Sequence, residues 1–264
     1  MEVDNSLRER YNPDGSKLRQ MQLRLLDMLL YLDKVCKEQG INWRLDYGNV
    51  LGAVRHEGFI PWDDDADILV EKKDFKRLCS YLIKHPHPQY VLQCNKTDKG
   101  YYSHGWVTLR DKKSRYIQDS IIHNVRNFRG AQIDIFRYES HINPKLSSLF
   151  WRIEKFNATH FIGRNPYAAQ LVYDILEHIV EPLFKVCGYF FSSGKVIAHS
   201  YGFFDNRQIP KNIHAPYKTI IFEGHLFPVP NDPKSYLELL YGDYMTLPPE
   251  DRRVGHEAEY DIWE

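Results

Sequence analysis

Four carboxylates fall within residues 63–67, where the sequence reads Asp63-Asp64-Asp65-Ala66-Asp67. Like charges at this spacing repel one another strongly, and Asp is disfavoured within strands. The apolar residues that follow predict a strand over Asp65 to Val70, and side chains alternate across a strand, so Asp65 and Asp67 emerge on one face. Two carboxylates on one face suit a hard divalent cation such as Mg²⁺. Taken alone, however, an acidic run is more often solvated surface.

A single aspartate interrupts an apolar segment later in the chain. Asp134 lies within Ala131-Gln132-Ile133-Asp134-Ile135-Phe136, which reads as a strand. A buried carboxylate is costly unless it is paired or bound to a metal. Asp134 is therefore the natural third ligand if its strand lies beside the strand that begins at Asp65.

A glycine turn precedes the acidic run. The residues Tyr47-Gly48-Asn49 are expected to form this turn, and Val50 to His56 a brief helix after it. A helix start presents unpaired backbone N–H groups to a phosphate, and Arg55 adds a permanent positive charge nearby. A surface position on the same helix explains Arg55 equally well.

The turn, the Asp65–Asp67 pair and Asp134 together form the arrangement of a nucleotidyltransferase. Its chemistry is two-metal phosphoryl transfer, in which metal ions neutralise the diphosphate and activate the attacking oxygen. The sequence therefore predicts that Asp65, Asp67 and Asp134 bind Mg²⁺ or Mn²⁺ and are the catalytic residues.

Other charged residues near these motifs have more than one interpretation. His256 stands in a loop-like tail, where it either contacts phosphate or the acceptor or is an ordinary surface histidine. Asp63 and Asp64 are expected to support the metal ligands rather than to bind the metal. Arg110 ends a predicted strand, where an exposed charge is favoured over a residue that lines the cleft.

The rest of the chain supplies the elements that must position these residues. Apolar residues at helical spacing predict a helix over Lys17 to Gln39, which Gly40 ends. Alternation and turn residues predict strands at 42–46, 65–70, 90–93, 104–110, 131–137, 219–223 and 225–229, and helices at 72–84, 146–161, 168–191 and 232–240. This order predicts an α+β (mixed α/β) fold, with a nucleotidyltransferase-type central sheet flanked by helices and a helical insertion.

These elements divide the chain into four parts. We expect a polar leader over 1–16, a catalytic core over 17–143, an aromatic-rich helical lobe over 144–217, and strands, a helix and a loop over 218–264 that complete the active site. Core packing, contact with a membrane surface and contact with a partner each explain the aromatic residues of the lobe.

Composition limits the classes of function. The 264 residues include 35 Lys plus Arg and 35 Asp plus Glu, so the chain has no net formal charge and no nucleic-acid partner is expected. The four cysteines are widely spaced, which disfavours disulfides and a cysteine zinc site. The first residues lack the apolar segment of a signal peptide, so a cytoplasmic location is expected.

The motifs resemble the LicD family, which includes the fukutin-type transferases. The matching residues are Leu45-Asp46-Tyr47-Gly48, Leu51-Gly52-Ala53-Val54-Arg55-His56 and Gly58-Phe59-Ile60-Pro61-Trp62-Asp63-Asp64-Asp65-Ala66-Asp67. Residues 130–136 resemble the family's second acidic strand, and Tyr241-Gly242-Asp243-Tyr244-Met245, Pro248-Pro249 and His256 resemble its C-terminal element. Asn49 departs from the pattern, since nucleotidyltransferases usually have Gly, Ser or Thr there.

The resemblance implies transfer of a phosphorylated alcohol, such as phosphocholine or a polyol phosphate, from a CDP-linked donor to a glycan hydroxyl, with release of CMP. The glycan acceptor would belong to lipopolysaccharide, teichoic acid, capsule or a related polymer. The resemblance also implies that Asp65, Asp67 and Asp134 hold magnesium, that Gly48 and Asn49 face the donor phosphates, and that Arg55 and His256 assist. A lipid-linked acceptor would add peripheral contact with the inner face of the membrane.

Two other classes of function stay open. A true nucleotidyltransferase would use the same metals to move a nucleoside monophosphate to a small molecule or protein, and it would release pyrophosphate. A non-catalytic nucleotide-binding module would keep the fold without turnover.

Overall fold

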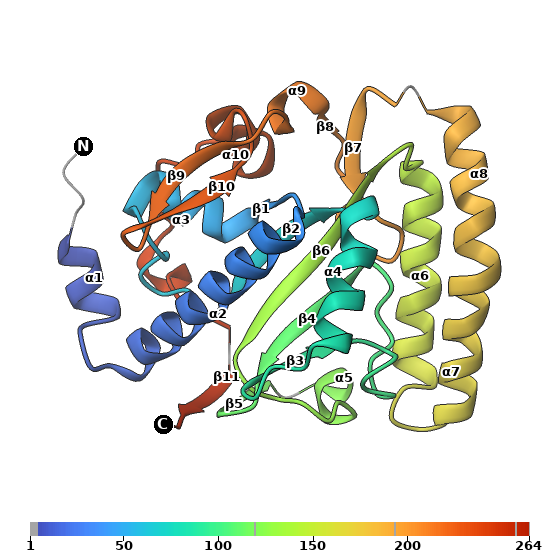
Figure 1. Ribbon diagram of the computed structural model, residues 1–264, viewed down its shortest axis with the longest axis horizontal. Helices are drawn as coiled ribbons and strands as arrows, with labels where there is room; N and C mark the ends of the chain where they lie inside the picture. Colours follow the sequence, from blue (N-terminus) through green and yellow to red (C-terminus); the bar gives the residue numbers. More distant parts are fainter. Residues whose placement is uncertain (1–4, 119, 193, 257, 264) are drawn as a thin grey trace.

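A mixed β-sheet forms the centre of the molecule in the computed structural model, which describes residues 5–118, 120–192, 194–256 and 258–263. Hydrogen-bonded neighbours follow the order β1-β2-β6-β4-β3, and β7 and β8 extend the sheet beyond β6 (Figure 1). The strands are β1 (Trp43–Leu45), β2 (Ala66–Glu71), β3 (Tyr90–Gln93), β4 (Trp106–Asp111), β6 (Gln132–Ser140), β7 (Val196–His199) and β8 (Ile209–Pro210).

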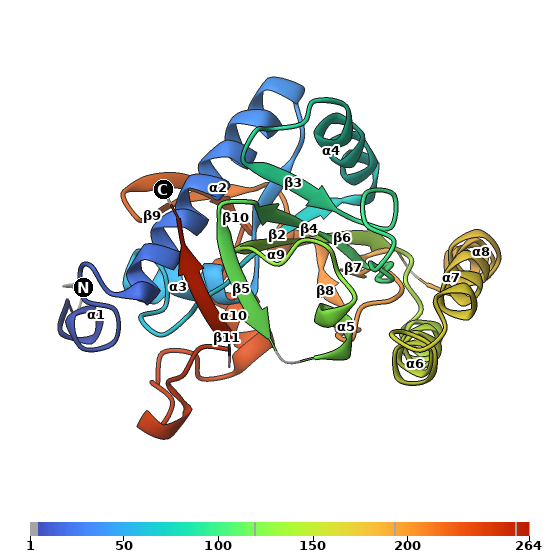
Figure 2. The ribbon, with the colours of Figure 1, turned by 90° about the horizontal axis from the view of Figure 1, so that it is seen from below.

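The register of β2 and β6 assigns the two faces of this sheet. The two strands are parallel and place Asp67 opposite Asp134 and Ile68 opposite Ile135. Because side chains alternate, the carboxylates lie on one face and the fully buried isoleucines on the other. Helices α2 (Lys17–Gln39) and α4 (Lys72–Lys84) lie together on one side of the sheet (Figure 2).

Helix α2 has the limits that its sequence predicts. The Ser16 side chain accepts a hydrogen bond from the Arg19 N–H at the first turn, and Gly40 ends the helix with a φ of 59°. Gln22, which is fully buried on α2, donates its side-chain N–H to the carbonyls of Ile60 (3.2 Å) and Asp63 (2.9 Å). The helix thus holds the loop that carries the acidic residues.

The C-terminal elements pack beside the glycine turn. The predicted hairpin is present as β9 (Lys218–Phe222) and β10 (His225–Val229), and it is followed by α10 (Pro233–Tyr241). Helix α10 and strand β9 both contact α3 (Tyr47–His56). A salt bridge of 2.6 Å from Arg19 to Glu223 ties the hairpin to α2.

The predicted helical lobe is a helical hairpin at the edge of the molecule far from α1 (Asn5–Tyr11), as Figures 1 and 2 both show. Its elements are α6 (Pro144–His160), α7 (Pro166–Ile175), the π-helical turn η1 (Leu176–Val180) and α8 (Glu181–Phe191). After α8 the chain returns to the sheet, because β7 pairs with β6. In the part of the chain that the structure describes, no helix has the length and hydropathy needed to cross a membrane.

The α+β class is confirmed, but several elements were not predicted. Strands β5 (Ser114–Gln118) and β11 (Ala258–Ile262) form a separate two-stranded antiparallel sheet, although the sequence predicted an irregular tail. Both strands are short, and their partners lie far apart in the chain. Short helical segments also occur at α5 (Ile121–Asn124), α9 (Lys211–His214) and η2 (Glu250–Arg252). All four cysteines are free, as their spacing predicts.

Candidate active site

The structure brings Asp65, Asp67 and Asp134 to the start of the two parallel strands. Asp67 lies opposite Asp134 in register, and Asp65 directly precedes β2. Burial raises the pKa of Asp65 to about 6, with Asp134 adding to the increase and His256 opposing it. Burial also raises the pKa of Asp67, and the charges of Asp65 and Asp134 raise it further. The three carboxylates therefore lie close enough to repel one another.

Asp134 has a hydrogen-bond donor that the sequence did not single out. The fully buried Thr108 lies opposite it on β4 and donates from Oγ1 to Asp134 Oδ1 at 2.7 Å. Burial raises the pKa of Asp134, while the bond from Thr108 and the charges of Arg110 and Arg126 lower it. Thr108 thus orients the carboxylate and favours its ionised form.

Arg110 is buried, so the prediction of an exposed charge at a strand end was wrong. Its side chain donates from Nε to Gln93 and from one terminal nitrogen to the Gly130 carbonyl, both at 2.9 Å. Burial and the neighbouring Arg126 lower the pKa of Arg110 to about 10. Arg110 is held in the interior because Gln93 of β3 and Gly130, before β6, accept its hydrogen bonds. Neither acceptor is near Arg110 in sequence.

The residues predicted to form a separate phosphate-binding turn are the first turn of α3, so the prediction of a turn before the helix was wrong. Helix α3 starts at Tyr47, and the side-chain oxygen of the buried Asn49 accepts the Asp67 N–H at 2.6 Å. The Asn49 N–H donates to the Asp46 carbonyl at 3.0 Å, so it is not free to bind a donor phosphate. A Cβ added at Gly48 would lie 3.0 Å from Asp63 Oδ2, which shows how closely Asp63 approaches this turn.

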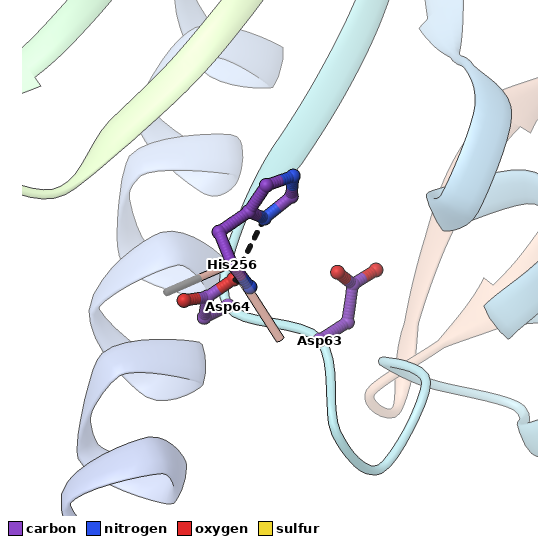
Figure 3. Close-up of side chains that lie close together, drawn as sticks. All are labelled: Asp63, Asp64 and His256. Atoms are coloured by element: carbon purple, nitrogen blue, oxygen red, sulfur yellow. Dashed lines mark hydrogen bonds and ion pairs between the residues drawn. The ribbon is translucent and has the colours of Figure 1, made fainter. Parts of the chain in front are cut away.

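Asp64 anchors the C-terminal segment through His256 (Figure 3). Asp64 is 2% exposed, and its Oδ1 accepts the backbone N–H of His256 at 3.0 Å and contacts the ring Nδ1 at 2.9 Å. The same Nδ1 lies 3.6 Å from Asp65 Oδ2. The hydrogen bond to Asp64 raises the pKa of His256 to about 9 in spite of partial burial. His256 is therefore an imidazolium near the carboxylates at neutral pH.

Arg55 binds the same C-terminal region rather than pointing freely into solvent. It donates to the Tyr244 carbonyl at 2.8 Å, and its Nε lies 2.9 Å from His56 Nε2. Burial and the nearby charge of Arg253 lower the pKa of Arg55. Arg55 and Arg253 thus bring two positive charges to this part of the site from different segments.

A buried network lies on the other side of the glycine turn. Asp46 is fully buried, contacts His199 Nε2 at 3.2 Å and accepts the Tyr236 hydroxyl. The Tyr47 hydroxyl donates to Asp205 at 2.7 Å. These contacts join segments that are far apart in sequence, so no local pattern predicts them.

An aromatic cluster adjoins the carboxylates on the same face of the sheet. Phe136 lies two residues beyond Asp134 on β6. Trp106 of β4 lies opposite Phe136, just as Thr108 lies opposite Asp134. The members are Tyr47, Trp106, Phe136, His199 and Phe203, with centroid distances from 4.3 Å (His199–Phe203) to 6.2 Å (Trp106–Phe136). Tyr47 and Trp106 are half-buried, and the other members are buried. Tyr47 and Trp106 are thus the members of the cluster that keep some exposure to solvent.

Two groups of side chains are candidates to hold a metal ion. Among the described residues, the group whose ligand atoms all lie within 4.8 Å is Asp63, Asp64 and His256. In that group Asp64 Oδ1 is in contact with His256, so a metal ion would have to displace the proton of the imidazole. Asp65, Asp67 and Asp134 offer oxygen ligands of the kind that Mg²⁺ prefers, and their mutual repulsion favours a bound cation. The triad thus offers a second candidate set of ligands, although its ligand atoms do not all lie within 4.8 Å of one another in this structure.

Comparisons with known proteins identify the family of the chain. A family model described as "LicD/FKTN/FKRP, nucleotidyltransferase domain" matches residues 40–183, which include all three carboxylates. The chain is 27% identical over 261 residues to the lipopolysaccharide cholinephosphotransferase LicD of Haemophilus influenzae, covering 92% of this chain and 96% of that protein. It is also 24% identical to an uncharacterised protein of Rickettsia prowazekii, over 48% of this chain and 53% of that one.

A mixed sheet that presents clustered carboxylates at the start of two parallel strands defines a phosphotransferase here, in agreement with these matches. The chain belongs to the LicD family.

Proposed function

We propose that this chain transfers phosphocholine from CDP-choline to a hydroxyl of a lipopolysaccharide-type glycan, using Mg²⁺ or Mn²⁺ held by Asp65, Asp67 and Asp134. The observation that carries the proposal is the convergence of these carboxylates beside the Thr108 donor. The relative from Haemophilus influenzae, named as a lipopolysaccharide cholinephosphotransferase, supports the choice of group and acceptor.

In the proposed reaction, an acceptor hydroxyl transfers its proton to water, and its oxygen attacks the phosphorus of phosphocholine. The bond from that phosphorus to the oxygen of CMP breaks, and CMP leaves with the electron pair. Bound metal ions would neutralise the diphosphate charge. The chain's own contribution is positioning: Thr108 orients Asp134, Asn49 fixes the start of β2 and Gln22 holds the acidic loop.

The aromatic cluster supports choline as the transferred alcohol. A quaternary ammonium is attracted to the faces of Trp and Tyr rings. Trp106 and Tyr47 present such rings next to the carboxylates. We expect Trp106→Ala to raise the KM for CDP-choline by about tenfold, because the cation–π contact is lost. The same variant should change the KM for CDP-glycerol little, since glycerol carries no cation, and Trp106→Phe should retain part of the preference.

The decisive test is CMP release by the purified chain with Mg²⁺ and a set of CDP-choline, CDP-ribitol and CDP-glycerol. Asp67→Asn and Asp134→Asn should each lower turnover by about a thousandfold, since each removes a charged ligand worth several kcal/mol. Calorimetric Mn²⁺ binding should be lost in the same variants, and Asp27→Asn, at an exposed aspartate of α2, is the matched control. Full turnover in both variants would sink the proposal, and release of pyrophosphate would favour transfer of a nucleoside monophosphate instead.

A further inference from the structure

The outer face of the helical hairpin carries a long row of exposed apolar side chains. Helices α7 and α8 continue through η1 from Pro166 to Phe191, a length of about 40 Å. A residue of the row occurs every three or four positions, so the row runs along one side of the helix. Its members are Tyr167 (88% exposed), Leu171 (60%), Ile175 (42%), Ile179 (55%), Leu183 (59%), Val186 (57%) and Phe190 (74%). A continuous apolar surface of this kind marks an interaction site.

The opposite face of the same helix is fixed to the domain. Leu176 is 1% exposed in a small core beneath the hairpin, and a Cβ added at Gly188 would lie 2.1 Å from the His141 carbonyl oxygen. The buried Glu181 accepts a hydrogen bond from Arg137 of β6 at 2.5 Å. The helix is therefore held against the sheet, and only its outer face is available to a partner.

The neighbouring helix α6 also carries exposed positive charge. Lys145, Leu149, Arg152 and Phe156 are exposed and follow one another at intervals of three or four residues, so cations alternate with apolar groups along one side. Lys155 lies 5.1 Å from the ring centroid of Trp151.

Negative charge is scarce on the same surface. Asp174 is the single exposed carboxylate within residues 144–191, all of which the structure describes. The acidic side chains of Glu154 and Glu181 are turned inward, where His104 and Arg137 pair with them. The chain as a whole has no net charge, yet this surface is apolar and cationic.

We propose that the outer face of α6–α8 docks on an anionic lipid bilayer, with the helices lying in the plane of the interface. Apolar side chains would enter the headgroup region, and Lys145, Arg152, Lys155 and Arg164 would meet anionic headgroups. A second copy of the chain fits less well, because a two-fold contact through α6 would place Lys145 and Arg152 of both copies near one another. Docking would hold the active site at the surface where a lipid-linked glycan lies, a consequence that rests on the proposed function, whereas the docking itself does not.

The test is flotation of the full chain with phosphatidylethanolamine vesicles that contain or lack phosphatidylglycerol. Binding should require the anionic lipid and should weaken as salt is raised. Phe190→Ser with Leu183→Ser should weaken binding at least about tenfold, because two exposed apolar groups no longer enter the interface. Arg152→Glu with Lys155→Glu should weaken binding to the anionic vesicles by a similar factor.

The matched control is Ile221→Ser with Leu226→Ser, an exposed apolar pair that lies face to face on β9 and β10, and its vesicle binding should equal that of the unmodified chain. Turnover of CDP-choline with a detergent-free soluble acceptor is measured in every variant. Normal vesicle binding without turnover overturns the proposed function alone. If the hairpin variants bind vesicles as well as the unmodified chain does, the docking proposal is wrong. It is also wrong if the unmodified chain binds no vesicles and is a dimer in light scattering that the same serine substitutions convert to a monomer.

Discussion

Replacement of Thr108 by Val is expected to weaken metal binding while every carboxylate remains in place. Val has nearly the shape of Thr but cannot donate the 2.7 Å hydrogen bond to Asp134. A hydrogen bond to a charged group contributes about 1.5–3 kcal/mol. Because this bond lowers the pKa of Asp134, its loss also makes the ionised carboxylate less favourable.

This free energy sets the size of the effect. At about 1.4 kcal/mol for each factor of ten, the metal concentration that gives half-maximal CMP release should rise roughly 10- to 100-fold. High metal concentration should restore most of the turnover, since the ligands are intact. Calorimetric titration with Mn²⁺ measures the same loss without catalysis.

A matched control separates this effect from the loss of any threonine hydroxyl. Thr159→Val removes a hydrogen bond of 2.7 Å from an exposed threonine of α6 to the Lys155 carbonyl, and it should leave metal dependence unchanged. If Thr108→Val shows normal metal dependence and a normal circular dichroism spectrum, Asp134 is not a metal ligand oriented by Thr108, and the reasoning fails.

Three further predictions concern stability. Glu181→Gln should lower the free energy of unfolding by about 3 kcal/mol, because it leaves the buried Arg137 without its carboxylate. Although burial raises the pKa of Glu181, Arg137 and Lys185 lower it overall, so thermal unfolding should show the full difference above pH 4.5 and a shrinking one as pH falls below it. When a chelator keeps the protein free of metal, the pKa of Asp65 in the folded state lies at about 6, above its ordinary value of 3.8. Unmodified protein should therefore lose stability as pH rises through this interval, Asp65→Asn should lose less, and Mg²⁺ should raise the melting temperature of the unmodified chain at neutral pH. Asn49→Ala should lower the free energy of unfolding by about 1–3 kcal/mol, because the Asp67 N–H loses its acceptor, and denaturant titration measures this change.

Each of these predictions has a result that contradicts it. Asp174→Asn, an exposed change on the same hairpin, should leave the free energy of unfolding nearly unchanged. If it lowers that free energy as much as Glu181→Gln does, the buried pair of Arg137 and Glu181 is not the cause. If the stability of Asp65→Asn and that of the unmodified chain change with pH in parallel, the pKa of Asp65 is not raised by folding. An Asn49→Ala variant of unchanged stability would mean that the Asn49–Asp67 bond is replaced by another acceptor.

Local patterns in the sequence were sufficient for most of the elements and for the metal-binding hypothesis. The strand period put Asp65 and Asp67 on one face, and the apolar run around Asp134 marked a strand that proves to lie beside β2. Helix α4 has the predicted limits, and helix α2 ends at Gly40 as predicted. These features depend on residues within a few positions of one another, so the sequence alone contains their signal.

Only the tertiary structure decided which residues support and surround the carboxylates. Thr108 meets Asp134 across two strands, and His256 reaches Asp64 from 192 positions away. Arg110 was misjudged because its burial depends on acceptors supplied by other segments. Contacts of this kind leave no periodic trace in the chain, and the pKa of a carboxylate is set by burial and by the charges that folding brings near it. The sequence by itself thus determined which carboxylates are the candidate metal ligands, and the fold determined how they are oriented and charged.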